Sequence, residues 1–85
     1  MKKIINAIIV VEGKSDVQFL ESFIDAEFII TNGSDVPRET IDYLKNSSLN
    51  KKILVLTDPD SPGKRIRDIL NNEIPNLLHA YVDKN

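Results

Sequence analysis

Short apolar runs alternate with segments of helical periodicity along the whole chain. Residues 4–11 (IINAIIVV) are almost continuously apolar and rich in β-branched side chains, which is typical of a strand buried on both faces of a parallel sheet. Three further apolar runs, at residues 27–31, 52–57 and 78–82, have the length of strands. The pattern therefore predicts four strands.

Each gap between these strands has apolar residues at the spacing of one helix face. The expected stripes are Val17, Leu20, Phe23 and Ile24; Ile41 and Leu44; and Ile66, Ile69, Leu70 and Ile74. Ser15 followed by Gln18 has the spacing of a capping box, with Ser15 as the N-cap. Pro37 suits a first helical turn and Ser61 an N-cap, while Pro75 ends the last helix.

The order strand, helix, strand, helix, strand, helix, strand predicts an α/β fold. We expect one domain over residues 1–85, with a four-stranded, mainly parallel sheet and three helices packed on its faces in a Rossmann-like three-layer arrangement. The segments that follow parallel strands meet at one edge of the sheet, which we call the carboxyl edge. Ligands of open α/β sheets bind at that edge.

Composition excludes several classes of protein. The 85 residues include no Cys, so a disulfide scaffold, a thiol nucleophile and a Cys-based zinc site are excluded. The single histidine, His79, excludes His-rich metal sites and most Ser-His triads. The apolar runs are too short to span a bilayer, and we expect a cytoplasmic protein. A net charge of −2 argues against nucleic-acid binding by bulk electrostatics alone.

Three acidic residues follow predicted strands. Glu12 comes after the first strand, and Asp58 and Asp60 come after the third. Crowded carboxylates repel, and a divalent cation is the usual way to keep them ionised. Carboxylate oxygens favour hard ions such as Mg²⁺, so we expect a magnesium site formed by these residues. The alternative is a purely structural role, in which Asp58 and Asp60 only form a turn and a helix cap.

Basic residues flank the same edge. They are Lys14, Lys64, Arg65, Arg67 and Lys84. Each alone suits a solvated surface position, but as a group they can contact backbone phosphates. Asn32 and Ser34 are candidates to orient a water molecule or a phosphate oxygen. Tyr43 and Tyr81 are expected in core packing, and His79 in a structural or peripheral place.

Four blocks of the sequence resemble a Toprim domain. They are VVEGKSD (residues 10–16), TNGS (31–34), TDPDSPGKRIR (57–67) and HAY (79–81), and the resemblance covers essentially the whole chain. More narrowly, the blocks are similar to the Toprim domain of the ribonuclease M-five family. This resemblance implies a Mg²⁺-dependent endoribonuclease that trims precursor 5S ribosomal RNA in the maturing large ribosomal subunit, with contacts to ribosomal proteins.

The resemblance also implies roles for the acidic residues. Glu12, Asp58 and Asp60 match the metal-binding and catalytic acids of the family, with Asp58 between two Mg²⁺ ions and Mn²⁺ as a possible substitute. In related Toprim enzymes the glutamate is also proposed as a general acid or base. Members carry a second, C-terminal domain that engages the ribosomal substrate, and residues 1–85 correspond to the Toprim domain without it.

Other functions stay open on the sequence. The chain also fits a stand-alone small Toprim protein that acts on another nucleic acid. A phospho-acceptor receiver module likewise has an Asp after its third strand, although it needs a fifth strand and has no use for Asp60. An Asp-x-Asp phosphatase places its motif on the first strand, and a silent binding module would leave the acids unused.

Overall fold

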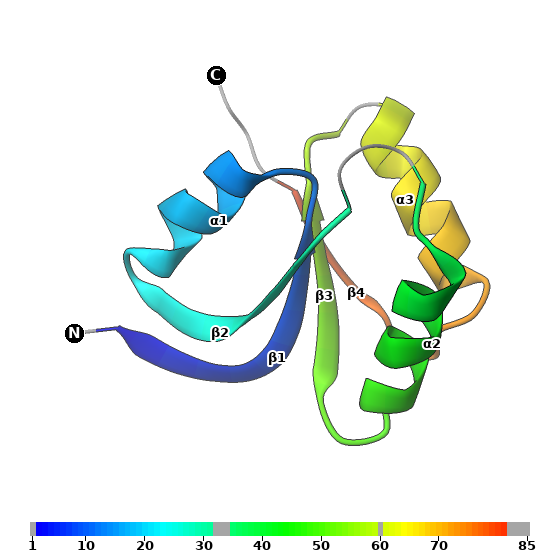
Figure 1. Cartoon of the computed structure of the whole chain (residues 1–85), viewed down its shortest axis with the longest axis horizontal. Helices are drawn as coiled ribbons and strands as arrows, with labels where there is room; N and C mark the ends of the chain where they lie inside the picture. Colours follow the sequence, from blue (N-terminus) through cyan, green and yellow to red (C-terminus); the bar gives the residue numbers. More distant parts are fainter. Residues whose placement is uncertain (1, 32–34, 60, 82–85) are drawn as a thin grey trace.

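The computed structural model describes residues 2–31, 35–59 and 61–81. Strands and helices alternate in the expected order (Figure 1). The elements are β1 (Lys3–Val11), α1 (Lys14–Glu21), β2 (Ile24–Ile30), α2 (Arg38–Ser47), β3 (Lys52–Thr57), α3 (Ser61–Asn71) and β4 (Leu78–Tyr81). Within the described residues, no helix combines the length and the apolar character that crossing a membrane requires.

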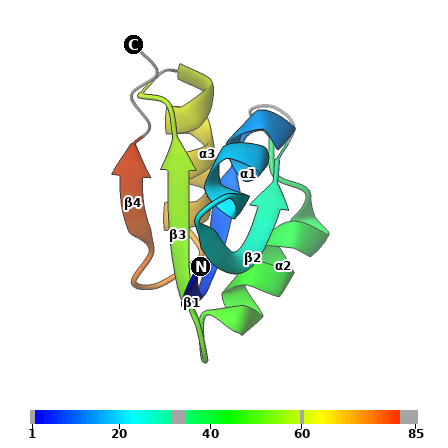
Figure 2. The same cartoon turned by 90° about the vertical axis from the view of Figure 1, so that its left-hand side faces the viewer.

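The four strands form one parallel sheet in the order β2-β1-β3-β4. In this register Val10 pairs with Val55, and Thr57 pairs with Tyr81. Figure 2 shows the arrowheads of β2, β3 and β4 at the same end of the molecule. The ends of β1 and β3, which carry two of the candidate acids, are therefore neighbours at the carboxyl edge.

The helices cover both faces of the sheet, so the predicted three-layer α/β fold is confirmed. In Figure 1, α1 lies on one side of the strands and α2 and α3 lie on the other. The larger core lies beneath α2 and α3, where the fully buried Leu44, Ile66 and Leu70 pack against the central strands. A smaller core under α1 includes Ile9, Val11 and Leu20. Because β1 contributes to both cores, its sequence is apolar at consecutive positions.

The start of α1 differs from the expected one. The helix begins at Lys14, with Gly13 rather than Ser15 as its N-cap. Asp16 takes the place expected of Gln18, because its carboxylate accepts a hydrogen bond of 3.3 Å from the backbone N–H of Gly13. The cap expected from the side chain of Ser61 at the start of α3 stays a prediction, because the structure describes the backbone of that residue and not its side chain.

The second strand is longer than the apolar run predicted. It begins at Ile24, which we had expected on the helix stripe with Phe23. Ile24 pairs with Lys3 of β1, so the backbone of Ile24 is part of the sheet and is not available to extend α1. The helix therefore ends at Glu21, and Phe23 is 45% exposed in the connection.

Tyr43 is not part of the core, contrary to the sequence prediction. It is 44% exposed, and its hydroxyl donates a hydrogen bond to the carboxylate of Glu27 on β2. The buried face of α2 is formed by Ile41 and Leu44, and Tyr43 projects to one side of it.

The core beneath α2 gives a stability prediction. Leu44→Ala removes a fully buried side chain and is expected to lower the free energy of unfolding by about 2–5 kcal/mol. Leu49→Ala is the matched control, because Leu49 is 77% exposed just after the same helix and its truncation should change stability by less than about 0.5 kcal/mol. Urea denaturation followed by circular dichroism measures both, and equal effects would contradict this description of the core.

Candidate active site

The first two candidate acids meet at the carboxyl edge, as the sequence predicted. Glu12 follows β1 and Asp58 follows β3, and these strands are adjacent in the sheet. The backbone N–H of Asp58 donates a hydrogen bond of 3.2 Å to Oε1 of Glu12. Both residues are half-buried. One carboxylate thus helps to fix the backbone that carries the other.

Gly63 brings the start of α3 against this backbone. A Cβ atom at position 63 would lie 2.5 Å from the carbonyl oxygen of Asp58 and 2.6 Å from Oγ1 of Thr57. No larger residue fits without movement of the backbone. The Thr57 hydroxyl itself lies 3.1 Å from the same carbonyl oxygen and donates to it. The contact between α3 and the end of β3 therefore sets the position of Asp58.

Arg67 is buried, whereas the sequence suggested a surface cation available to phosphates. Only 5% of the residue is exposed. Its guanidinium donates to Oγ1 of Thr57 at 3.0 Å and to the carbonyl oxygen of Ala80. It also lies 2.8 Å from Nδ1 of His79. A buried charge needs such partners, and here they join the ends of β3 and β4 to α3.

His79 supports the Arg67 guanidinium, in the structural role that the sequence predicted. Arginine is only a donor, so Nδ1 of His79 accepts from Arg67, and the ring proton is on Nε2. Nε2 in turn donates to Oδ1 of Asn71 at 3.0 Å. Partial removal of the ring from water lowers the pKa of His79, and the positive charge of Arg67 lowers it further.

Tyr81 is exposed beside this network rather than packed in the core. It is 61% exposed, and the guanidinium of Arg67 lies over its ring, 3.9 Å from the centroid. The ring borders a hollow of about 620 Å³ between α3 and β4. Asp58, Lys64 and Arg67 also line this hollow, so it opens next to the candidate metal site.

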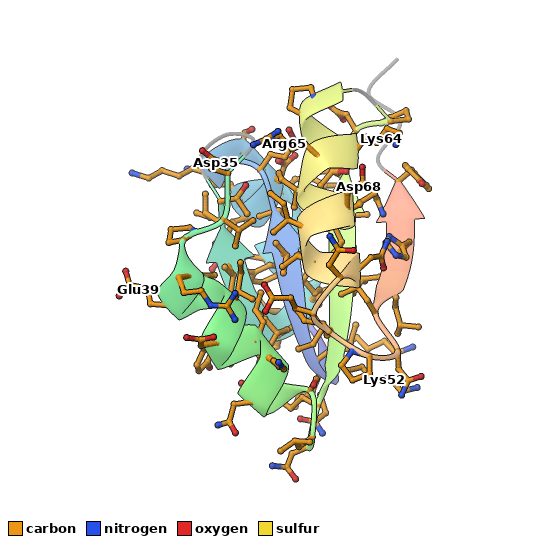
Figure 3. The ribbon with its side chains drawn as sticks, turned by 90° about the vertical axis from the view of Figure 1, so that its right-hand side faces the viewer. Asp35, Glu39, Lys52, Lys64, Arg65 and Asp68 are labelled. Atoms are coloured by element: carbon orange, nitrogen blue, oxygen red, sulfur yellow. The ribbon has the colours of Figure 1, made fainter. Side chains whose placement is uncertain are left out.

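Two exposed basic residues, Lys64 and Arg65, lie on different sides of α3 (Figure 3). Lys64 lies on the side of α3 toward β4, 3.3 Å from Asp68. Arg65 lies on the other side, 3.5 Å from Asp35. Lys14 is exposed at the start of α1, two positions after Glu12. Lys64 is therefore an exposed cation that lines the hollow together with Asp58.

Four predicted site residues lie outside the described part of the chain: Asn32, Ser34, Asp60 and Lys84. Among the residues that are described, no group of three His, Asp or Glu side chains is placed to hold a metal ion. The donors that are described, the carboxylates of Glu12 and Asp58, are oxygen ligands, which suit a hard divalent cation. This donor set fits Mg²⁺ or Mn²⁺, with Asp60 as the expected third ligand.

Some residues of the site were missed by sequence reasoning. Gly63 and Thr57 lay inside a block quoted for its acids, and the contact between them depends on how α3 packs on β3. Nothing in the sequence indicated a role for Asn71, because it becomes a hydrogen-bond partner of His79 only in the tertiary structure. The available signal was Gly63 itself, since a glycine inside a helix indicates a close approach.

The sequence and the fold define one family. Residues 7–84 match the Toprim domain family, and the chain belongs to it. The structure also resembles that of a small TOPRIM domain protein from Bacillus stearothermophilus, with a TM-score of 0.78 over 99% of this chain and 74% of the other. The identity in that comparison is 23%, so it supports the fold alone.

Several curated proteins named Ribonuclease M5 are similar to this chain. The one from Staphylococcus aureus is 36% identical over 80 residues, which are 94% of this chain and 45% of the relative. The one from Mycoplasma genitalium is 41% identical over 81 residues, or 95% of this chain and 46% of the relative. The one from Fusobacterium nucleatum is 41% identical over 85 residues, or 99% and 46%. The chain thus spans about half the length of these relatives.

The packing of α3 predicts the effect of a single methyl group. Gly63→Ala is expected to destabilise the fold by about 1–3 kcal/mol, because the added Cβ overlaps the Asp58 carbonyl oxygen. Gly13→Ser is the matched control beside Glu12, since a Cβ there meets no atom within 4 Å and Ser is a good N-cap. Thermal unfolding measures the stability of both variants. A Gly63→Ala protein as stable as the original chain would contradict the proposed contact.

The lowered pKa of His79 predicts a pH dependence of stability. The folded state favours the neutral ring, so the unfolded chain binds the proton more readily and stability falls as pH drops below about 6.5. Because His79 is the single histidine, His79→Gln should remove this component of the pH profile between pH 7.5 and 5.5. Superimposable profiles of free energy of unfolding for the two proteins would argue against the arrangement.

Proposed function

We propose that this chain is the catalytic Toprim portion of a metal-dependent endoribonuclease that hydrolyses phosphodiester bonds in precursor 5S rRNA during maturation of the large ribosomal subunit. The observation that carries the proposal is the contact between Glu12 and Asp58 at the carboxyl edge. The similarity of the chain to proteins named Ribonuclease M5 supports the class of substrate.

In this proposal Glu12, Asp58 and Asp60 would hold Mg²⁺, with Mn²⁺ as an alternative. Bound divalent ions activate water and stabilise charge on the phosphate that is attacked. Carboxylates that lie near one another repel. The N-terminal ends of α1 and α3 follow directly after the two acidic segments and contribute positive partial charge there.

The chain itself positions the carboxylates. Glu12 accepts from the backbone N–H of Asp58, Thr57 donates to the Asp58 carbonyl oxygen, and Gly63 leaves that oxygen no room for a Cβ. Both the backbone N–H and the carbonyl oxygen of Asp58 are therefore engaged before any ligand binds. Such preorganisation is what positions reacting groups without further cost during catalysis.

The substrate contacts in this proposal come from exposed cations near the acids. Lys64 lines the hollow beside Asp58, and Lys14 follows Glu12. We propose that these two residues contact backbone phosphates, with Asn32 and Ser34 orienting water or phosphate oxygens. Because the net charge is −2, binding of free RNA by this chain is expected to be weak at physiological salt. Contacts to the ribosomal particle and its proteins would then add affinity.

Arg67 takes a positioning role in this proposal, in place of a direct phosphate contact. Its two terminal nitrogens, Nη1 and Nη2, already serve Thr57, Ala80 and His79. It therefore acts on the reaction through the loop that bears Asp58.

The metal site predicts distinct effects of two amide substitutions. Asp58→Asn is expected to weaken Mn²⁺ binding at least 10-fold and to abolish cleavage of precursor 5S rRNA, since a charged ligand is lost. Glu12→Gln keeps an oxygen that can accept from the Asp58 N–H, so it should fold normally and still lose metal affinity. Calorimetric Mn²⁺ titration and a gel assay of the RNA in isolated precursor particles measure the two properties.

Asp25→Asn is the matched control for both variants. Asp25 is an exposed acid on β2 that pairs with Ile4, near the end of the sheet opposite the carboxyl edge. Its amide variant should keep the metal affinity and cleavage of the original chain. Unchanged metal affinity in Asp58→Asn would contradict the metal-site proposal. Normal metal binding with cleavage of a different RNA would instead indicate a stand-alone Toprim nuclease.

A further inference from the structure

Tyr81 has an unusual environment for an aromatic residue at the end of a strand. It lies at the last position of β4, an edge strand, and is 61% exposed. Neighbouring residues on the same face of the sheet, such as Val55 and Thr57, are almost fully buried. The ring therefore contributes little to the core, and its position calls for another explanation.

One face of the Tyr81 ring is already supported. The guanidinium carbon of Arg67 lies 3.9 Å from the ring centroid, and three hydrogen-bonding partners hold Arg67 in place. A cation fixed against an aromatic face restrains the ring. With one face covered and 61% of the residue exposed, the opposite face is accessible to a ligand. The arrangement is a rigid, exposed aromatic platform.

The platform lies next to the candidate metal site. Tyr81 pairs with Thr57 in the sheet, and Asp58 is the next residue after Thr57. Tyr81, Asp58 and Lys64 all line the hollow of about 620 Å³. This volume lies in the range of pockets that bind small organic ligands.

We propose that Tyr81 is a stacking site for a nucleobase of the RNA next to the phosphate that is cleaved. The inference rests on the proposed function and extends it, because it assigns a base-binding position to a site so far described by its carboxylates. The base stacks on the open face of the ring, while Lys64 lies near its phosphate. Every base has a flat π face, so the site binds without strong sequence preference.

The chain offers a direct spectroscopic test. It has two Tyr and no Trp, so Tyr43→Phe leaves Tyr81 as the only tyrosine fluorophore. The probe is a single-stranded eight-nucleotide RNA at low salt with Ca²⁺, which takes oxygen ligands as Mg²⁺ does. An abasic oligomer with the same sugar-phosphate backbone is the control. We expect saturable quenching by the RNA and none by the abasic oligomer, and equal quenching by both would overturn the stacking site.

Variants of Tyr81 test the same contact by affinity. Tyr81→Phe keeps a stacking ring and should bind the RNA as the original chain does. Tyr81→Leu should bind roughly 5- to 100-fold more weakly, as expected for loss of one stacked base. Phe19→Leu is the matched control, because Phe19 is a 66% exposed aromatic on α1 outside the hollow. Fluorescence anisotropy of a labelled RNA measures all three, and unchanged affinity in Tyr81→Leu would overturn the proposal.

Cleavage assays separate this proposal from the function on which it rests. A Tyr81→Leu chain that cleaves precursor 5S rRNA with an unchanged KM overturns the stacking site and leaves the nuclease proposal intact. Base-dependent quenching at Tyr81 in a chain that cleaves no RNA supports the stacking site and rejects the nuclease proposal.

Discussion

The buried cation Arg67 joins the elements that surround the site. Its guanidinium reaches Thr57 at the end of β3 and Ala80 and His79 on β4, while its own backbone belongs to α3. Burial of a charge is costly unless it gains hydrogen-bonding partners, and the partners of this guanidinium hold the three elements in one relative position. The position of Asp58, the shape of the hollow and the support beneath Tyr81 all depend on that arrangement.

Negative and positive charges lie close together at the carboxyl edge. Glu12 and Asp58 place negative charge where the proposed RNA substrate would bring more of it, and the chain as a whole has a net charge of −2. Positive contributions come from the ends of α1 and α3 and from Lys64 beside the hollow. The local field therefore matters more than the total charge, and a bound divalent cation would complete the balance at the acids.

Residues at this edge fall into two sets. One set positions the backbone around Asp58, and the other faces solvent. Thr57, Gly63 and Arg67 are buried and define the backbone around Asp58. Lys64 and Tyr81 are exposed in the same hollow and are available to a ligand. A site of this kind keeps its geometry because its framework belongs to the core, while its binding groups remain accessible to solvent.

The alternation of apolar runs and helical stripes was enough to predict the α/β fold, the parallel sheet and the meeting of Glu12 with Asp58. These features depend on local periodicity and on the rule that parallel strands end at one edge, both of which are readable along the chain. The strand order, the burial of Arg67, the exposure of Tyr81 and the close contact at Gly63 were decided only in three dimensions. Each of them depends on which residues, distant in sequence, pack against one another, and a charge or an aromatic ring looks the same in a sequence whether it ends in the core or in water.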